Sequence, residues 1–387
     1  MADNTLTGLI QTIYKSLDTV SREQVGFIPA VRRFDFDNKK VAQNEPITYP
    51  VVPSFGAPSA ISASNIISDP SGITVGHNTI LMDNVNMISW GWNGEEATGL
   101  GNSGIFATTQ TDAFTQAFRA FALQIEQTIA ALAIQGSRAS GTAGTIPFTT
   151  TDDLSDLNNP REILQNNGQY FPGKMQMVLS NTALNKLRSK QGIVFKANEA
   201  GTMDRQLTGV VTQLEGWNLH ETVSAPSHTA GTGALYVVDG NVAAGATTIA
   251  IKTGSGTVVA GDVVAIPSAN GVTYKYLVKT GVVAAGNIVI TAPGVVSAIS
   301  DGATVTIEAT YKANVAFQQD AITLISALPN LPENGDQAVN RINVQDKWTG
   351  LLFEVSEYKG FRKTIYVVAA AFGAAVVKPE GVALLVQ

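Results

Sequence analysis

The stretch from Asp112 to Arg138 constrains the fold more than any other, because its apolar residues repeat at helical spacing over about seven turns. The apolar residues that recur there at intervals of three and four are Phe114, Phe118, Phe121, Ile125, Ile129 and Leu132. They form one stripe, and polar residues such as Glu126 fall outside it. Thr111 is expected to cap the helix and Gly136 to end it. We therefore predict a long core helix with one buried face.

The composition indicates a β-rich chain with enough apolar material for two or three domains. Of the 387 residues, 44% are hydrophobic and 14% are charged, and the 36 glycines favour short strands with tight turns. So low a charge density favours a surface that other copies of the chain cover. The net charge of -6 argues against the positively charged surface that a dedicated nucleic-acid-binding protein needs. It does not exclude a protein that encloses nucleic acid. The absence of cysteine excludes disulfides and thiolate chemistry.

The chain shows neither an export signal nor a membrane segment. Asp3 precedes any lysine, and no basic segment followed by an apolar run opens the sequence, so a signal peptide is not predicted. The longest uncharged apolar segment, Thr364 to Val377, is shorter than the roughly twenty residues that span a bilayer. We expect a protein of cytosolic origin.

Two arms are predicted before the long helix. Residues 1–40 carry a short amphipathic helix that docks on its own body or on a neighbour, an alternative that the pattern leaves open. The apolar stripe of this N-terminal arm includes Leu6, Leu9, Ile13 and Leu17. In residues 41–98, the extended segments Pro46–Val52 and Asn78–Asn86 flank a stretch rich in Ser, Ala, Gly and Pro. This pattern is typical of a projecting arm, or of an ordinary surface hairpin.

After the long helix, the pattern changes to α/β and then to β. A weaker helix over Thr150–Leu164, with a potential break at Pro160, precedes a buried strand over Lys174–Ser180. A short helix to Leu187 follows, and Ser180 or Asn181 is expected to cap it. Residues 224–312 contain short alternating strands separated by turn signals, which is typical of a small inserted barrel or sandwich. The strands predicted within it are Thr248–Lys252, Val263–Ile266, Val272–Val278, Asn287–Thr291 and Ala303–Ala309. The chain then resumes with Val315–Leu328, Leu351–Tyr358 and an apolar strand region over Ile365–Val386.

The residues that carry chemistry form no recognisable catalytic or metal-binding pattern. Of the three histidines, only His220 begins a zinc-protease-like motif, and Ser224 stands where the second ligand is needed. The glycine pattern Gly99–Gly104 lacks the preceding strand of a dinucleotide site, so we interpret it as a hinge before the long helix. The Asp152, Asp153 and Asp156 cluster has no partner that would tune it for acid–base catalysis. We predict that the protein is not an enzyme and has no cofactor or metal.

The end of the chain carries a family resemblance. The segment Phe372–Gly381 is similar to the closing segment of tailed-phage major capsid proteins, with an aromatic-Gly pair, four residues, and a basic-Pro-Glu triplet. The motif residues are Phe372, Gly373, Lys378, Pro379 and Glu380, with Lys378 where the family more often has Arg. Asn314–Pro329, Gly201–Val210 and Gly261–Ile266 resemble further segments of the same family. The order of features matches over most of the chain, and most resembles coat proteins of short-tailed phages of the Salmonella podovirus type, which carry an inserted β-barrel.

The resemblance implies an α+β chain of the Hong Kong ninety-seven type with an N-terminal arm, an extended arm (E-loop), a peripheral domain, an axial domain and an inserted barrel. The implied boundaries are N-terminal arm 1–40, extended arm 41–98, peripheral domain 99–170 with a spine helix over 112–138, first axial part 171–223, barrel 224–312, and axial return with closing strands 313–387.

The implied function is a major capsid protein that assembles into pentamers and hexamers of an icosahedral shell. The shell encloses double-stranded DNA without sequence-specific binding, and the protein is located in the virion after assembly in the host cytoplasm. A portal and, because the chain begins at Met1 without a coiled leader, a separate scaffolding protein are the expected partners. The alternatives are an encapsulin-like cargo shell, a β-rich adhesin or carbohydrate-binding protein, and a hydrolase with an unrecognised site.

Overall fold

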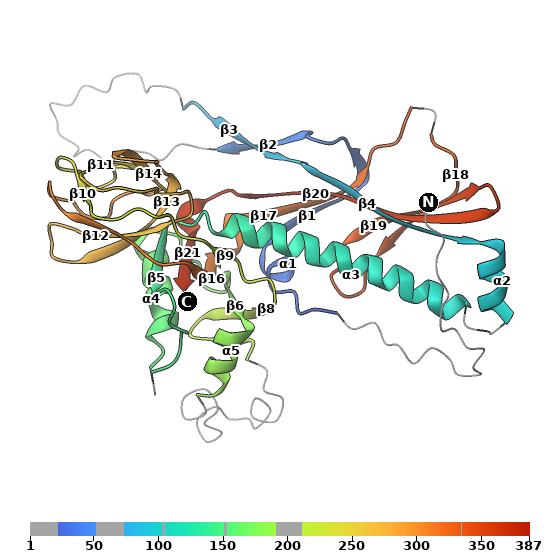
Figure 1. Ribbon diagram of the computed structural model, residues 1–387. Helices are drawn as coiled ribbons and strands as arrows, with labels where there is room; N and C mark the ends of the chain where they lie inside the picture. Colours follow the sequence, from blue (N-terminus) through green and yellow to red (C-terminus); the bar gives the residue numbers. More distant parts are fainter. Residues whose placement is uncertain are drawn as a thin grey trace, which may run out of the picture.

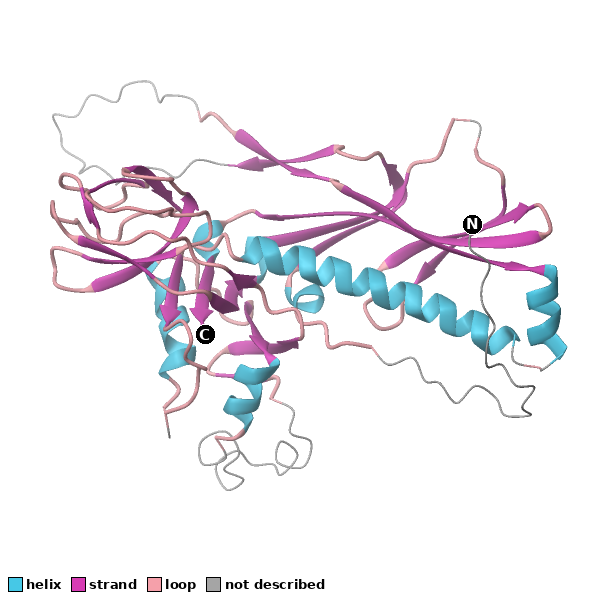
Figure 2. Ribbon diagram, in the orientation of Figure 1, coloured by secondary structure: helices cyan, strands magenta, loops and turns pink. Residues whose placement is uncertain are grey.

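A six-stranded sheet, a larger sheet that includes a barrel, a two-stranded ribbon and one long helix make up the protein (Figure 1). Strands occupy more of the described chain than helices do (Figure 2), and the predicted mixture of helices and strands is confirmed. The computed structural model describes residues 22–51, 73–102, 104, 106–150, 153–190, 211–333 and 335–387.

The six-stranded sheet combines segments from both ends of the chain. Its strands are β1 (Arg32–Val41), β4 (Asn84–Asn93), β17 (Ile322–Pro329), β18 (Ala338–Gln345), β19 (Leu352–Gly360) and β20 (Lys363–Val376). β19 and β17 pair with successive parts of β20, whose other edge pairs with β4. β1, which pairs in parallel with β17, was not predicted within the N-terminal arm. Its partner lies near the other end of the chain, so no local hairpin signal marks it.

The long helix α3 (Phe106–Ala133) packs across this sheet, with bounds that differ from the prediction at both ends. It begins before Asp112, because Phe106 continues the apolar face and contacts Trp92 edge-on, with ring centroids 6.1 Å apart. Thr111 is therefore not a cap. Its hydroxyl instead donates to the carbonyl of Ala107 within the helix, at 2.9 Å. The helix ends before Gly136, and Arg138 already belongs to the next strand.

Of the glycines in the predicted hinge Gly99–Gly104, Gly99 and Gly101 are helical, and Gly104 lies in the turn before α3 with φ of 70°. The helix α2 (Gly94–Asn102) contains Gly99 and Gly101, and Asn93 and Glu96 cap its start reciprocally. Glu96 accepts from the Asn93 amide at 3.0 Å, and the Asn93 side chain accepts from the Glu96 amide at 2.8 Å. This capping-box arrangement satisfies donors of the first turn and offsets the low helix propensity of glycine.

The larger sheet continues beneath the end of α3. Its non-barrel strands are β5 (Arg138–Gly141), β6 (Met175–Ser180), β7 (Gln213–Leu214), β8 (Trp217–Thr222), β9 (Ser227–His228), β16 (Tyr311–Gln318) and β21 (Val382–Val386). Its flanking helices are α4 (Ser155–Asn166) and α5 (Asn181–Arg188). The predicted strand over Lys174–Ser180 and the helix capped by Ser180 are confirmed, because the Ser180 hydroxyl accepts from the Ala183 amide at 3.2 Å. α4 runs through Pro160 without a break.

Two short 3-10 turns carry the chain from one sheet to the other. η1 (Gln319–Ala321) separates β16 from β17, and η2 (Pro379–Gly381) separates β20 from β21. The sequence pattern predicted one extended segment in each of these regions, whereas the structure has two strands in different sheets. Both strands of each pair are apolar, so the pattern shows no change at the point where the chain passes from one sheet to the other.

The barrel lies at one end of the molecule and has its own core. Its strands are β10 (Tyr236–Val238), β11 (Thr248–Lys252), β12 (Val263–Pro267), β13 (Thr273–Thr280), β14 (Gly286–Ile290) and β15 (Thr304–Ile307). Pairing between β12 and β13 closes the six strands. The five strands predicted here occur at nearly the predicted positions, and β10 is the additional strand. One pair, Tyr276 with Arg138, joins the barrel to β5.

The two extended segments predicted in residues 41–98 form an antiparallel ribbon of β2 (Pro46–Val51) and β3 (Gly76–Leu81). The segment predicted as one strand over Asn78–Asn86 breaks after Leu81, and β4 begins at Asn84 on the six-stranded sheet. At the base of the ribbon, Ile80 and Met82 are buried against Val41 and Ala371. Most of the polar stretch between the two strands, residues 52–72, lies outside the described residues.

Candidate functional site

A short strap near the N-terminus, Arg22–Val31, is fixed to α3 by a buried carboxylate. Glu126 of α3 has no exposed surface. Its oxygens accept from the amides of Gly26 at 2.6 Å, Phe27 at 2.9 Å and Ile28 at 3.0 Å, which lie at the start of the short helix α1 (Phe27–Ala30). The hydroxyl of Thr222 in β8 also donates to it, at 2.7 Å.

The sequence placed Glu126 outside the apolar stripe and gave it no partner, whereas the structure buries it. A carboxylate is stable in a buried position when amide donors at a helix start surround it. Burial raises the pKa of Glu126, and the hydrogen bonds from the strap amides and Thr222 oppose that shift. The donors are about a hundred residues away in sequence, so helical periodicity alone gives no signal for this contact.

Ion pairs hold the preceding part of the strap. Arg22 donates to both carboxylate oxygens of Asp346, at 2.8 and 2.7 Å, and Glu23 pairs with Arg119 of α3. Burial alone would raise the pKa of Asp346, but hydrogen bonds from Arg22 and Thr349 outweigh it and hold the pKa below its usual value. The strap therefore ties α3, β8 and the loop after β18 together.

The predicted spine residues divide into three environments. Phe121, Ile125 and Ile129 are buried in the core between α3 and the sheets. Phe114 and Phe118 are half-buried beside that core, and Phe118 stacks on Phe353 with ring centroids 5.1 Å apart. Leu132 is also half-buried, and it lines a shallow outer depression instead of the core. The remaining buried positions on the helix are mostly alanines, which let it approach the sheets closely.

The family-like closing motif lies where β20 turns into β21. Phe372 is fully buried, and a Cβ on the neighbouring Gly373 would lie 2.2 Å from the carbonyl oxygen of Leu81 at the base of the ribbon. Lys378 is exposed, and Pro379 begins η2. The Glu380 carbonyl accepts from the Asn167 side chain at 2.9 Å. The motif thus joins the arm, the six-stranded sheet and the larger sheet. The N-terminal residues predicted to dock, Leu6, Leu9, Ile13 and Leu17, lie outside the described residues.

The histidines occupy separate structural settings. His220 hydrogen-bonds Gln176 at 2.9 Å, and burial lowers its pKa. His228 contacts the fully buried carboxylate of Asp262 at 2.8 Å, where the barrel joins the body. Within the described ranges, no three His, Cys, Asp or Glu side chains gather closely enough to hold a metal ion. Among the same residues, no helix has both the length and the apolar character to cross a membrane.

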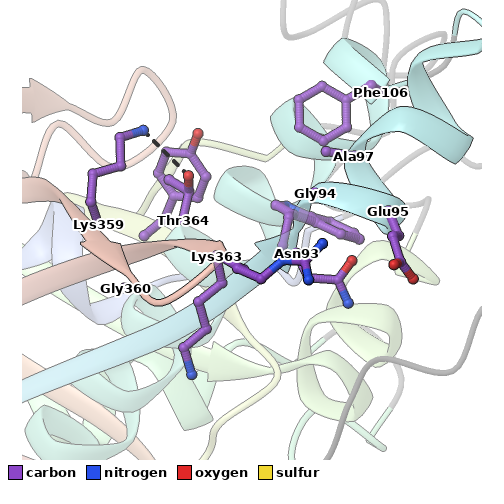
Figure 3. A pocket seen from close by; sticks show the side chains of 12 residues that line it. Asn93, Gly94, Glu95, Ala97, Phe106, Lys359, Gly360, Lys363 and Thr364 are labelled. Carbon is purple, nitrogen blue, oxygen red and sulfur yellow. Dashed lines mark hydrogen bonds between the residues drawn. The ribbon is translucent and has the colours of Figure 1, made fainter.

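The most prominent surface feature is the tip of the β19–β20 hairpin, which sequence reasoning did not single out. Phe361 at this tip is 92% exposed, and Arg362 has a left-handed backbone with φ of 55°. A cavity of about 760 Å³ lies beside the tip, between this hairpin and the start of α2. Figure 3 shows Phe106 and Ala97 on its helical side and Lys359 and Thr364 on its strand side.

Comparison with solved structures reveals related folds that extend over the whole chain. A capsid chain of cyanophage A-1(L) has a TM-score of 0.52 and 8% identity, with 98% of each chain covered. A capsid chain of cyanophage P-SCSP1u has a TM-score of 0.51 and 11% identity, with 100% of this chain and 96% of that chain covered.

The chain has a phage-capsid fold. A chain from Mycobacterium phage Che8 is also similar, with a TM-score of 0.51, 13% identity, and 99% and 98% of the two chains covered. Comparisons with protein-family models and with curated protein sequences give no match. At such identities the comparisons show the fold alone, and within the closing motif Phe372 is buried whereas Lys378 is exposed.

Proposed function

We propose that this protein is the major capsid protein of a tailed phage and assembles into an icosahedral shell. The observation that carries the proposal is the similarity to the capsid chain of cyanophage A-1(L), which covers 98% of both chains. A capsid-like fold that accounts for the barrel, ribbon and long helix together favours a shell subunit over an adhesin or a hydrolase. An encapsulin-like cargo shell is less favoured, because the chain carries a barrel and the phage-like closing motif.

The finer architecture we propose is the Hong Kong ninety-seven type. α3 is then the spine helix of the peripheral domain, and the ribbon of β2 and β3 is the extended arm that reaches a neighbouring subunit. The larger sheet, with α4 and α5, corresponds to the axial domain near the capsomer axis. The proposed peripheral and axial domains are not each one continuous stretch of sequence. β5 and α4 belong to the predicted peripheral segment 99–170, but they pack with the larger sheet.

We propose that the barrel is an inserted domain, as in coat proteins of the Salmonella podovirus type. Most of its buried side chains form a core of their own, its strands close on themselves, and only Val263 and Leu277 pack into the core of the body. His228 and Tyr311, which flank it, are paired in antiparallel strands, so a short Asn-Gly turn can replace residues 229–310. The remaining chain is expected to stay folded with α3 packed on its sheet. Unfolding of the shortened chain, seen as loss of hydrogen-exchange protection in α3, would contradict the division.

The subunit's partners follow from the proposed role. Copies of this chain form pentamers and hexamers, a separate scaffolding protein and a portal take part in assembly in the host cytoplasm, and the shell encloses double-stranded DNA. The acidic net charge suits a container, because a lining that bound DNA phosphates tightly would hinder packaging and release. No catalytic role is proposed.

Sedimentation tests the proposal directly. The full chain is expressed alone and with candidate scaffolding proteins, and the soluble fraction is examined by sedimentation velocity. Large particles of uniform size are expected under at least one condition. A homogeneous 40.6 kDa monomer under every condition would contradict a capsid function.

A further inference from the structure

We propose that the barrel can rotate away from the body, and that a latch keeps it closed against the unfavourable burial of Arg138. The latch consists of His228, Gly261, Asp262 and Tyr311, on one side of the barrel. Arg138 lies on another side, where the barrel meets β5. The movement takes place within a single subunit and does not depend on the proposed capsid function.

The two chain segments that enter and leave the barrel run side by side at the latch. β9 ends with His228 on the way into the barrel, and β16 begins with Tyr311 on the way out. The two residues are opposite each other in the β9–β16 pair, and their rings lie 5.4 Å apart. A domain can rotate about such a connection when a few residues at the ends of its elements change their backbone angles.

Both segments bind the barrel loop that precedes β12. The Asp262 carboxylate, which has no exposed surface, contacts the His228 ring at 2.8 Å and accepts from the Gly231 amide at 3.0 Å. From the other segment, the Tyr311 hydroxyl donates to the carbonyl of Gly261 at 2.6 Å. A Cβ on Gly261 would lie 2.9 Å from the His228 ring, so this close approach requires glycine. These contacts fix the barrel to β9 and β16 of the body.

The closed latch satisfies polar groups that are costly to bury alone. Burial raises the pKa of Tyr311, and the nearby charge of Asp262 adds to the rise, so the hydroxyl remains protonated as a donor. A buried carboxylate such as that of Asp262 is stable only while its hydrogen bonds are made. The polar contacts of the latch therefore favour the closed position.

Arg138 has the opposite effect, because its charge is buried without a partner. The residue is only 4% exposed. Its Nη2 donates to the Ile163 carbonyl at 3.4 Å, which is long for a hydrogen bond, and its Nε has no partner. No carboxylate of the described chain forms an ion pair with it. Burial lowers the pKa of Arg138, so the closed position disfavours the charged guanidinium.

The barrel is one of the elements that cover Arg138. Tyr276 of β13 pairs with it, and the Tyr274 ring lies 5.9 Å from its guanidinium. Around this contact, the barrel strands add only Val263 and Leu277 to the core of the body. A buried charge without a partner is a store of strain, and an apolar residue in its place is often more stable. Rotation of the barrel would return the guanidinium to water.

A cavity of about 630 Å³ beside the latch leaves the barrel incompletely packed on the body. Its lining includes Ile134 at the end of α3, His228 and Gly261 of the latch, and Val278 of the barrel. Protein interiors are normally close-packed, so unfilled space here means that fewer apolar contacts oppose the rotation. The barrel also lies at one end of the molecule (Figure 1). The polar contacts of the latch are thus the main restraint on its position.

The first test measures the position of the barrel in the full chain by pulsed electron paramagnetic resonance. The chain has no cysteine, so Val283→Cys in the barrel and Gln127→Cys on α3 place two spin labels at exposed sites. The labelled parent should give one main distance, with any second population below about 10%. His228→Ala should increase the second population about fivefold or more, the effect of one lost side-chain hydrogen bond.

His220→Ala is the matched control for the latch. It also removes a partly buried imidazole with a side-chain hydrogen bond, to Gln176 at 2.9 Å, but far from the barrel linkers in β8. Its distance distribution should equal that of the parent. If His228→Ala also leaves the distribution unchanged, the latch is wrong.

The second test removes the buried charge with Arg138→Met. Added to His228→Ala, this substitution should restore the single distance, because nothing then favours the open position. Alone it should raise the urea concentration at the midpoint of unfolding. Arg161→Met is the control, because the Arg161 guanidinium donates to the Tyr170 hydroxyl at 2.9 Å and its loss should not raise the midpoint. A lower midpoint for Arg138→Met, or an open population that persists in the double variant, would contradict the role of Arg138.

Hydrogen exchange separates opening from unfolding. The amides of β11 in the barrel and of α3 in the body should stay protected in His228→Ala. If they do not, Tyr311→Phe, which removes only the hydroxyl of the latch, replaces it in the distance measurement, and a single distance there would reject the proposal. All these measurements use subunits below the concentration at which particles form. The latch can therefore fail while the capsid function stands, and the capsid function can fail while the latch stands.

Discussion

Removing the Glu126 carboxylate should detach the strap from α3 and destabilise the subunit. In Glu126→Ala, three backbone amides and the Thr222 hydroxyl lose their buried acceptor. Each buried donor left unsatisfied costs about 1–3 kcal/mol, but loss of the buried charge removes its own desolvation cost. The net decrease in the free energy of unfolding is therefore expected to be about 2–4 kcal/mol, because the unsatisfied donors together outweigh the desolvation cost that is removed.

Urea unfolding and hydrogen exchange measure the effect together. In Glu126→Ala the urea concentration at the midpoint of unfolding should fall. The amides of Gly26, Phe27 and Ile28 should lose their protection from hydrogen exchange before the rest of the subunit does. The matched control is Gln127→Ala at the exposed neighbouring position, with an expected change within about 0.5 kcal/mol. Equal stability of the two variants, or unchanged protection of the strap amides in Glu126→Ala, would refute the role of Glu126.

Three further perturbations test other parts of the subunit. Phe118→Ala should lower the free energy of unfolding by about 2–4 kcal/mol, because the half-buried ring stacks on Phe353, and Gln116→Ala on the exposed side should leave it unchanged in the same urea experiment. Asp346→Asn should remove the stabilisation from Arg22 at neutral pH. Because the folded-state pKa of Asp346 lies below its ordinary 3.8, that stabilisation is present above pH 3.8 and disappears as the pH falls through the folded value, so the two proteins should converge in acid unfolding curves. Gly373→Ala should destabilise the base of the ribbon by about 1–3 kcal/mol and increase proteolysis there, because its methyl group overlaps the Leu81 carbonyl; unchanged cleavage would argue against this contact.

The elements that sequence patterns located best are those stabilised by near neighbours. Barrel strands such as β11 and β14 alternate between more and less buried residues and end near glycine-containing turns, so periodicity and turn chemistry indicate them without knowledge of the fold. The helix capped by Ser180 was predictable for the same reason, because the Ser180 hydroxyl accepts a hydrogen bond from the amide of Ala183, only three residues further along the chain.

Features that depend on distant partners were not predictable in this way. β1 pairs with β17 near the other end of the chain, and Glu126 is stabilised by amides of the strap. The early start of α3 depends on Phe106 packing against Trp92, which outweighs the weak helix signal before Asp112. The hairpin tip has a short and inconspicuous sequence, and only the structure reveals that Phe361 is exposed beside an aromatic cavity. Family resemblance, carried by the closing motif, pointed to the capsid fold where periodicity alone could not.

Cryo-electron microscopy of the particles formed by the full chain tests the central claim most directly. We expect closed icosahedral shells whose repeating density accommodates the long helix, the six-stranded sheet and the barrel in each subunit. Amorphous aggregates, open fibres or a homogeneous monomer in the presence of every candidate scaffolding protein would contradict the assignment of this chain as a capsid subunit.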